Sequence, residues 1–405
     1  MRVTQGLEQS QFLTSLSTLE SNIAQTQNQV SNGKSFMNPS DNPAAAGAVD
    51  NYDAALAESQ QYTANADSAQ TSLTTQDTAL TSVQNQLQSL NSLALEANSG
   101  TESSSNLTSL ATQISQLQST LLSIANTQDG NGQYIFSGYA TQSQPFSLTA
   151  TGSHYSGDQG QQHVQIAAGQ TIATGDNGNT VFNNIPTGNG TYSVTAAPAN
   201  SGSGLIGATT VANPAAYDGK PFTISFSGPV GTTGTNTYTI NTTPAAATPV
   251  TGTYTSGQAI SVDGLQINLT GTPASGDSFS VDPSTSQSIF TTMQNLVTAL
   301  QAGNGTPASS TQLSNSIASA LNNIGQALNH TSNVQATVGG RLNAITTQLS
   351  VQTSQQTQLQ TSISGLQSLD YASAITSLQS QNTILTAAMQ SFTLTQGLSL
   401  FKYIS

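Results

Sequence analysis

The sequence has no cysteine and no tryptophan among its 405 residues. The absence of cysteine excludes disulfide bonds, thiolate nucleophiles and zinc sites with cysteine ligands. Charged residues are also scarce: 6% of the chain is Asp, Glu, Lys or Arg, whereas an ordinary soluble domain has about 25%. The polar surface must therefore be built largely from Gln, Asn, Ser and Thr.

Basic residues are the scarcest charged type. The chain has five of them against eighteen acids, which gives a formal net charge of -13. Nucleic acids and anionic membrane surfaces are bound by clustered Lys and Arg side chains, so we expect neither as a partner. From Pro283 to Leu369 the single charged residue is Arg341. Uncharged polar faces cost less to bury than ionised ones, which suits a surface that is covered during assembly.

Long apolar runs are absent as well. No segment of about 18 consecutive apolar residues exists, so we expect no membrane-spanning helix. The first residues, MRVTQGLEQSQFLTSL, contain no unbroken apolar core and no small-residue cleavage site. A cleaved secretory signal is therefore not visible.

Candidate catalytic residues are few and poorly spaced. The histidines His154, His163 and His330 have no HxxxH-type spacing. We interpret them as surface or capping residues; the alternative is a site that joins all three. Asp50 and Asp53 lie three residues apart on a predicted helix, which is the usual sign of a solvated face. No GxSxG nucleophile motif is present.

Two glycine-containing motifs have competing interpretations. Gly202, Gly204 and Gly207 match the GxGxxG pattern, but no strand clearly precedes them and Pro214 interrupts any following helix, so we predict a loop. Residues 176–179 resemble the start of a calcium loop without its later bidentate acid, and we predict a hairpin turn. We therefore expect no enzyme activity, no cofactor and no metal site.

Both ends of the chain carry apolar residues at intervals of three, four and seven. Such a repeat gives a helix a narrow seam that packs against a partner helix. Two seams at opposite ends predict that the chain begins and ends in the same place. Because a helix pair alone in water is marginal, we expect these ends to become ordered when partner subunits cover them. The predicted assembly interface consists of Leu13, Leu16, Ile23, Val30, Ile375, Leu378, Leu385, Met389, Phe392 and Leu398.

Apolar periodicity predicts six helices. Asn32-Gly33 and the NPSDNP cluster at 38–43 end the first, and we expect Ser40 or Asp41 to cap the second. Gly339-Gly340 is a predicted weak point in the fifth. The predicted helices cover residues 1–32, 44–99, 107–124, 289–300, 309–366 and 371–405.

Residues 145–283 have a different character, rich in Gly, Thr and Ser with short alternating runs. Runs such as HVQIAAGQTI and AISVDGLQINL predict strands. The aromatic stretch QYIFSGY (133–139) predicts a strand just before this region. We expect two similar-sized β parts, 145–195 and 217–283, joined by a low-complexity linker at 198–216.

The predicted fold class is therefore α+β and multidomain, with a long helical rod built from both chain ends and an inserted all-β region. Residues 1–40 with 368–405 form the terminal assembly segment, and residues 41–144 with 285–367 form the rod. Residues 145–284 form the inserted β domain.

Several stretches, taken in order, resemble the family of flagellins and hook-associated proteins. They are SNGKSFMNPSDNPAAA (31–46), residues 93–146, GRLNAI (340–345), the tail 369–404 and two stretches of the β region. The ending DGNGQYIFSGYATQSQPF and the tail sequence GLSLF are closer to hook-associated proteins than to flagellin. Two features depart from the family: the helices carry fewer charges, and residues 198–216 match nothing in it.

The resemblance implies a structural adaptor that joins hook-associated protein 1 at the hook end to the flagellin filament. It implies a ring of subunits held by the terminal helices, an export chaperone before secretion, and export through the flagellar type III apparatus. The location would be cytoplasmic before export and extracellular, in the flagellum, afterwards. The alternatives are flagellin itself and a secreted adhesin or type III translocator with a helical stalk.

Overall fold

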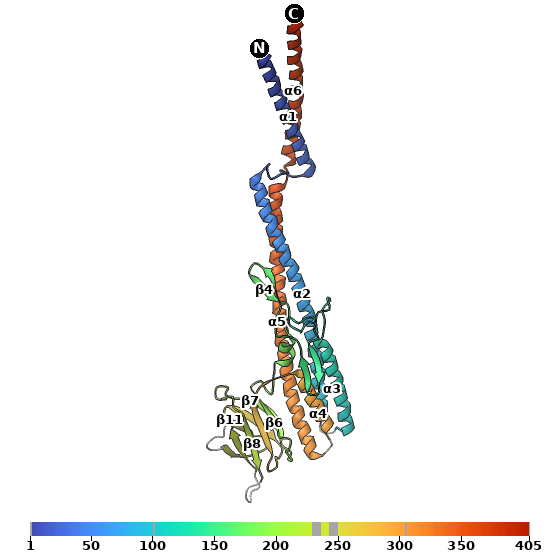
Figure 1. The fold of residues 1–405 in the computed structure, drawn as a ribbon. Helices are drawn as coiled ribbons and strands as arrows, with labels where there is room; N and C mark the ends of the chain where they lie inside the picture. Colours follow the sequence, from blue (N-terminus) through green and yellow to red (C-terminus); the bar gives the residue numbers. More distant parts are fainter. Residues whose placement is uncertain (1, 100–101, 229–235, 243–249, 304–305, 405) are drawn as a thin grey trace. The chain divides into compact units, whose positions relative to one another are not determined.

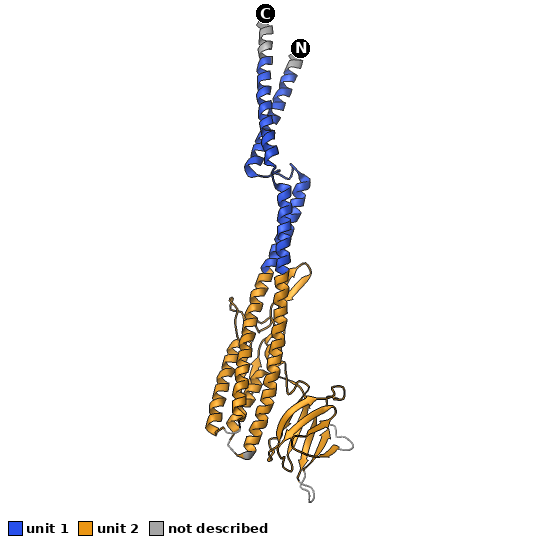
Figure 2. Ribbon diagram, turned by 180° about the vertical axis from the view of Figure 1, so that it is seen from behind, with its two compact units in different colours: residues 1–64, 348–405 blue, residues 65–347 orange. Residues whose placement is uncertain are grey.

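The computed structural model describes residues 2–99, 102–228, 236–242, 250–303 and 306–404, with the side chains of residues 2–5, 307 and 395–404 left out. The chain divides into two compact units, residues 1–64 with 348–405 and residues 65–347 (Figure 2). Long helices from both chain ends and an inserted all-β region confirm the predicted α+β class (Figure 1). The predicted three-part domain boundaries differ from these units and stay a prediction.

The first unit contains two helix pairs. α1 (Arg2–Asn32) and α6 (Tyr371–Ile404) lie side by side and antiparallel, with both chain termini at the same end (Figure 1). The start of α2 (Pro43–Ala97) pairs with the end of α5 (Pro307–Gln367). Polar layers join this second pair: Ser59 donates to Gln352 over 2.6 Å, and Gln356 donates to Thr63 over 2.9 Å.

Backbone hydrogen bonds between residues 33–35 and 367–369 connect the break between α1 and α2 to the break between α5 and α6. Gly33 ends α1 with a φ of 69°, which favours glycine. The Ser35 N–H donates to the Gln367 carbonyl over 2.7 Å, and the Leu369 N–H donates to the Gly33 carbonyl over 3.0 Å. The predicted break between the helices 309–366 and 371–405 is therefore confirmed.

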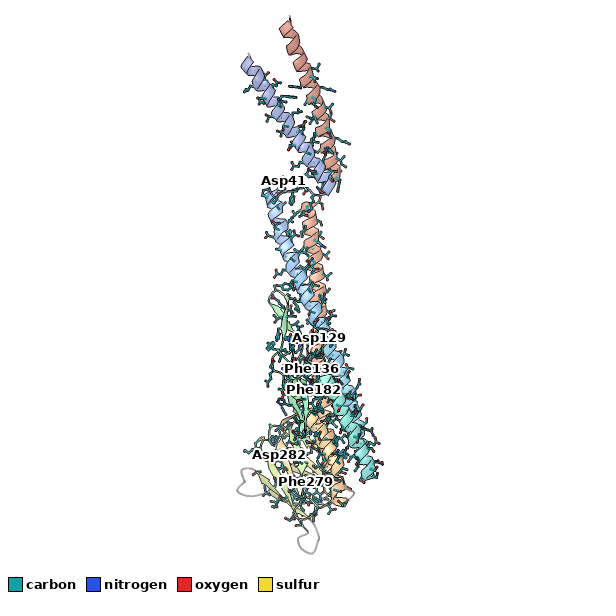
Figure 3. The ribbon with its side chains drawn as sticks, turned by 45° about the vertical axis from the view of Figure 1, so that its right-hand side comes forward. Asp41, Asp129, Phe136, Phe182, Phe279 and Asp282 are labelled. Atoms are coloured by element: carbon teal, nitrogen blue, oxygen red, sulfur yellow. The ribbon has the colours of Figure 1, made fainter. Side chains whose placement is uncertain are left out.

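The α2 cap differs from the prediction. Asn42 caps this helix, because its side-chain oxygen accepts from the Ala45 N–H over 3.1 Å. The Asp41 carboxylate (labelled in Figure 3) instead accepts from the Met37 and Asn38 N–H groups and closes the preceding turn. The prediction that Ser40 or Asp41 caps α2 is wrong.

The second unit has a helical part in which α2 and α5 are joined by α3 (Ser104–Ala125) and α4 (Ile289–Ala302). Apolar residues spaced seven apart on α2 are buried: Leu73, Leu80 and Leu87 are at most 1% exposed. α5 stays continuous through Gly339-Gly340. Short strands lie against these helices: β1 (Phe146–Thr149) with β2 (Gly152–Tyr155), β3 (His163–Ala167) with β4 (Gln170–Ala173), and β5 (Ile185–Pro186) with β14 (Ser286–Gln287).

A buried aromatic cluster ties these short strands to the helices. Phe146 and Phe182 make an edge-to-face contact at 5.3 Å, and Phe136 and Phe182 make another at 5.1 Å. Phe136 and Phe182 are labelled in Figure 3. Phe182 belongs to a π-helical turn, η1 (Asn179–Asn183), and Phe290 belongs to α4. Burial of such rings against one another is a large apolar contribution to stability.

The remaining strands form a two-sheet antiparallel sandwich. One sheet has the order β10-β9-β8-β13-β6 and the other the order β11-β12-β7. Alternate side chains such as Phe222, Ile224 and Phe226 point into a shared core that also holds Phe279 (Figure 3). The strands are β6 (Tyr192–Ala196), β7 (Leu205–Val211), β8 (Phe222–Ser227), β9 (Thr237–Thr242), β10 (Val250–Thr253), β11 (Ala259–Val262), β12 (Leu265–Thr270) and β13 (Ser278–Pro283).

Four predictions for the inserted region are wrong. Residues 198–216 are not a linker, because β7 pairs with β12 inside the sandwich, and Gly207 of the GxGxxG pattern lies in this strand. The sandwich therefore begins at β6 rather than at residue 217. QYIFSGY is a turn segment in which Tyr134 makes one isolated bridge. Residues 176–179 lead into η1 and do not form a hairpin.

Candidate assembly interface

α1 and α6 pack through a regular seam. On each helix the residues that face the partner step by four and three along the sequence, which is the spacing of an antiparallel coiled coil. All are buried or half-buried. The seam consists of Phe12, Leu16, Leu19, Ile23, Thr26 and Val30 on α1, and of Ala374, Leu378, Gln381, Leu385, Ala388 and Phe392 on α6.

Contacts along the seam fix the pairing of the two helices. The rings of Phe12 and Phe392 stack with centroids 4.6 Å apart and planes 3° from parallel. Farther along, the Thr26 hydroxyl donates to the Gln381 side-chain oxygen over 3.3 Å. A polar layer in an otherwise apolar seam specifies register at some cost in stability.

The sequence identified half of the seam. Six predicted residues lie in the seam, three on each helix and spaced seven apart. They are Leu16, Ile23 and Val30 on α1, and Leu378, Leu385 and Phe392 on α6. The other half includes Phe12 and Ala374. It was missed because the prediction followed mainly one residue per heptad. The sequence does contain a signal for the missed residues: each lies three or four positions from a predicted seam residue, as the second apolar position of a heptad does.

Three predicted residues lie outside the seam. Leu13, Ile375 and Met389 are 50%, 44% and 51% exposed. Each directly follows a seam residue in the sequence. Each residue advances about 100° round an α-helix. Because the two helices run antiparallel, the residues that directly follow seam residues lie on the same side of the pair on both helices. We call this exposed apolar strip the flank. The side chain of Leu398 lies outside the described residues.

A polar stripe on α5 holds the inserted region through hydrogen bonds to its backbone. Gln312 donates to the Ala197 carbonyl over 2.8 Å. Asn315 accepts from the Ile206 N–H over 2.8 Å and donates to the Gly204 carbonyl over 3.0 Å. Asn323 accepts from the Gly188 N–H over 2.8 Å, and His330 Nε2 lies 2.6 Å from the Thr180 carbonyl. Part of the uncharged polar face noted in the sequence is thus already covered within the chain.

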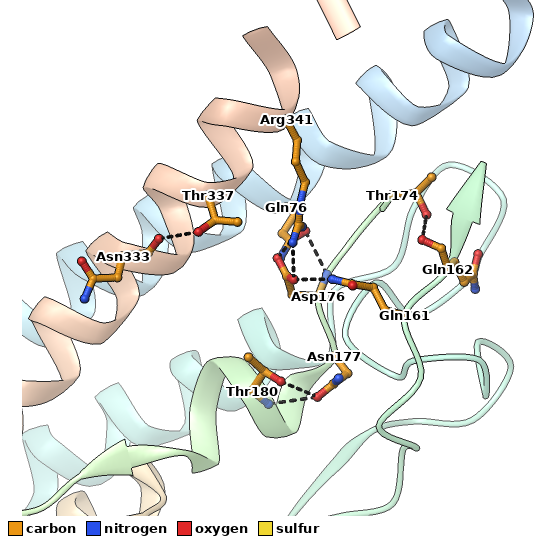
Figure 4. A network of polar contacts seen from close by, with 10 residues as sticks. All are labelled: Gln76, Gln161, Gln162, Thr174, Asp176, Asn177, Thr180, Asn333, Thr337 and Arg341. Atoms are coloured by element: carbon orange, nitrogen blue, oxygen red, sulfur yellow. Dashed lines mark hydrogen bonds and ion pairs between the residues drawn. The ribbon is translucent and has the colours of Figure 1, made fainter. Parts of the chain in front are cut away.

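The stripe ends in a largely buried ion pair. Arg341 donates to both oxygens of Asp176 over 2.9 and 3.0 Å, and Gln76 and Gln161 donate to the same carboxylate over 3.1 and 2.7 Å (Figure 4). Such fork-shaped pairing fixes orientation as well as charge. It explains why residues 176–179 do not form the predicted hairpin.

The structure separates the remaining candidate residues. His154 lies in β2, His163 in β3 and His330 on α5. Asp50 and Asp53 are exposed on α2, as expected for a solvated face. Within the described residues, no group of three or more His, Asp or Glu side chains is placed to hold a metal ion. Among the described helices, none combines the length and hydropathy needed to cross a membrane.

Comparison with known proteins agrees with this geometry. Residues 3–141 match the bacterial flagellin N-terminal helical region. Flagellar hook-associated protein 3 of Salmonella typhimurium is 29% identical over 185 residues, and that of Escherichia coli is 34% identical over 157 residues. The crystal structure of flagellar hook-associated protein-3 from Legionella pneumophila has a TM-score of 0.73 at 27% identity, covering 78% of this chain and 98% of that one. This chain resembles flagellar hook-associated protein 3.

The resemblance to hook-associated protein 3 differs in extent between sequence and fold. The curated sequences align over 46% and 39% of this chain, and over 58% and 49% of their own length. The chain thus spans about half the length of these relatives, whereas the Legionella pneumophila structure is covered almost entirely. The resemblance inferred from the sequence motifs is confirmed.

Proposed function

We propose that this chain is a structural subunit of the bacterial flagellum that joins hook-associated protein 1 at the hook end to the flagellin filament. The flank carries this proposal, in a chain that resembles hook-associated protein 3. Single exposed apolar residues are ordinary on protein surfaces. Leu13, Ile375 and Met389 lie on one side of one helix pair and form an apolar strip there, while Ile384 and Leu394 are exposed elsewhere on α6.

Neighbouring copies of the chain are the proposed cover of the flank, and together they would form a ring. Fully burying a Leu, Ile or Met side chain contributes about 1.5–3 kcal/mol, so covering the exposed half of one contributes about 1 kcal/mol. The low charge of the chain supports the same proposal, because uncharged polar faces beside the flank can be buried at modest cost.

The proposed position of the ring, between hook and filament, implies its other partners. Hook-associated protein 1 would contact it on the hook side and flagellin on the filament side. An export chaperone would hold the chain in the cytoplasm before type III export, after which the protein is extracellular, in the flagellum. The role is structural and non-enzymatic, with no cofactor.

The match of residues 3–141 to the flagellin N-terminal region favours one alternative, a filament subunit. The relatives' name, hook-associated protein 3, favours the junction. A helical-stalk adhesin or type III translocator is a further alternative, and it would need no cover for the flank.

Two adjacent substitutions test the proposal in a strain that lacks its own junction protein. The full chain and a Gln390→Asp control should restore attached filaments, because the exposed Gln390 side chain lies about 200° round the helix from the seam, beyond the flank. Met389→Asp should reduce the number of attached filaments at least tenfold, because a charge on the covered flank is left unpaired. Its thermal unfolding should match that of Gln390→Asp, since Met389 lies outside the seam.

Normal filament attachment with Met389→Asp would refute the flank as an assembly surface. Filaments built from this chain itself, rather than from flagellin, would support the filament-subunit alternative.

A further inference from the structure

Methionine is the only sulfur-containing residue of this chain, because cysteine is absent and four methionines are present. Three of them lie among the described residues with described side chains, and their environments differ. Met293 on α4 is 1% exposed, whereas Met37 is 46% exposed and Met389 is 51% exposed. The Asn32 amide donates to the Met37 sulfur over 3.8 Å. Met389 belongs to the apolar flank.

We propose that Met389 is an oxidation site at which a peroxide switches off assembly. This inference rests on the proposed function for its consequence, but not for its chemistry. Oxidation of methionine follows exposure of the sulfur and turns an apolar thioether into a polar sulfoxide. The flank is where that change of polarity has an effect, because the side chain is exposed in the free chain and covered in the assembly.

The reaction is a two-electron oxygen transfer. The Met389 sulfur attacks one oxygen of hydrogen peroxide, an S–O bond forms and the O–O bond breaks. The peroxide is reduced to water, and the thioether is oxidised to the sulfoxide. A thiol-dependent methionine sulfoxide reductase reverses the step by oxidising two thiols to a disulfide and releasing the oxygen as water.

The predicted consequence differs between the two exposed methionines. On α6 the polar residues one helical turn from Met389 are Thr386 and Thr393, and their hydroxyls already donate to the Asn382 and Gln390 carbonyls. Covering the new sulfoxide oxygen therefore leaves a buried acceptor without a partner from this helix. Met37 lies in a turn outside the flank, beside the Asn32 amide, which can donate to a sulfoxide. An unpaired buried acceptor typically weakens an interaction about tenfold or more.

The first arm of the test measures the chemistry. The purified full chain is treated with hydrogen peroxide, and peptides are quantified by mass spectrometry over time. Met389 and Met37 should oxidise at comparable rates, at least tenfold faster than Met293 in the same chain. Oxidation of Met389 as slow as that of Met293 would overturn the proposal.

The second arm measures the consequence. Isolated hooks from a strain without its own junction protein are incubated with the chain before and after peroxide treatment, and the bound chain is quantified by sedimentation. Oxidised protein should bind about tenfold less, and reductase with a thiol should restore binding. Met389→Leu should keep its binding after oxidation, whereas Met37→Leu should lose it as the unsubstituted chain does.

The proposed function and the oxidation switch predict distinguishable outcomes in this experiment. Absence of binding by the untreated chain would overturn the proposed function, and the control of assembly with it. Normal binding by the untreated chain together with equal binding by the oxidised chain would overturn this inference alone. An equal loss in Met389→Leu would also overturn it, because the effect would then come from another residue.

Discussion

Asparagine side chains hold backbone segments together at several places among the described residues. Asn315 satisfies the Ile206 N–H and the Gly204 carbonyl, and Asn126 satisfies both backbone groups of Phe146. Asn200 does the same for Ser278. One amide offers a donor and an acceptor without a charge. These residues therefore supply specific contacts in a chain with few ion pairs.

The hydroxyl of Tyr192 leads to a prediction for alkaline pH. It lies within 2.8 Å of the Gln266 carbonyl and 3.2 Å of the Thr210 carbonyl, and burial raises its pKa from 10.0 to about 12. Between these values the unfolded chain releases this proton before the folded chain does. Ionisation of this hydroxyl should therefore leave the free energy of unfolding unchanged below about pH 10 and lower it as the pH rises towards 12.

Tyr192→Phe provides the control for this pH dependence. It should lower the free energy of unfolding at pH 7 by about 1 kcal/mol, because a hydrogen bond is lost. It should also make the fall between pH 10 and 12 shallower. Denaturant unfolding of both proteins across that range, followed by circular dichroism, provides the measurement. The same slope in both proteins would show that Tyr192 ionises as it does in the unfolded chain.

Individual residues differ in how well the sequence predicts their roles. Leu73, Leu80 and Leu87 are buried, and their spacing of seven is enough to place them on one face of the helix predicted at 44–99. The role of Asn315 was not predictable in this way. Its partners Gly204 and Ile206 are about 110 residues away, and they are recognised through backbone groups that every residue type carries.

At the scale of elements, the α1–α6 pair separates one apolar repeat of the sequence into buried and exposed residues. Leu378 and Leu385 belong to the seam, whereas Ile375 and Met389 belong to the flank. All four occur in one apolar ladder at spacings of three, four and seven. Only the position of the partner helix decides which residues are internal.

A matched pair of substitutions on α6 tests this separation. Leu385→Asp should weaken the pairing of α1 with α6 by about 1–3 kcal/mol, because it places a charge in the seam. Its neighbour Ile384 is 53% exposed and lies outside the seam, so Ile384→Asp should leave pairing unchanged. Hydrogen exchange of amides in residues 8–31 of the free chain measures both effects.

Faster exchange in Leu385→Asp but not in Ile384→Asp is the expected result. Equal exchange in the two variants would mean that the seam is not formed in the free chain.

Helices were predicted better than strands for a physical reason. Periodicity within one segment is sufficient for α3, whose Leu107, Leu110 and Ile114 are buried as expected. β7 depends on pairing with β12 and on Asn315. Its own sequence, which follows Gly202 and Gly204, resembles a loop. The stretch at 176–179 was misjudged similarly, because Arg341 holds it from 165 residues away.

At the scale of the whole molecule, the scarcity of charge has one consistent explanation. Polar faces made of Gln, Asn, Ser and Thr are buried inside the chain where α5 contacts the inserted region, as at Asn315 and Gln312. The same chemistry would let neighbouring subunits cover each other around the flank. A highly charged surface would make that burial costly.

The central claim is that this chain forms the junction between hook and filament. Antibody directed against the β6–β13 sandwich, viewed by electron microscopy on intact flagella, tests it most directly. The account predicts a single band of label at the distal end of each hook. Label distributed along the filament, or label that never reaches the flagellum, would contradict it.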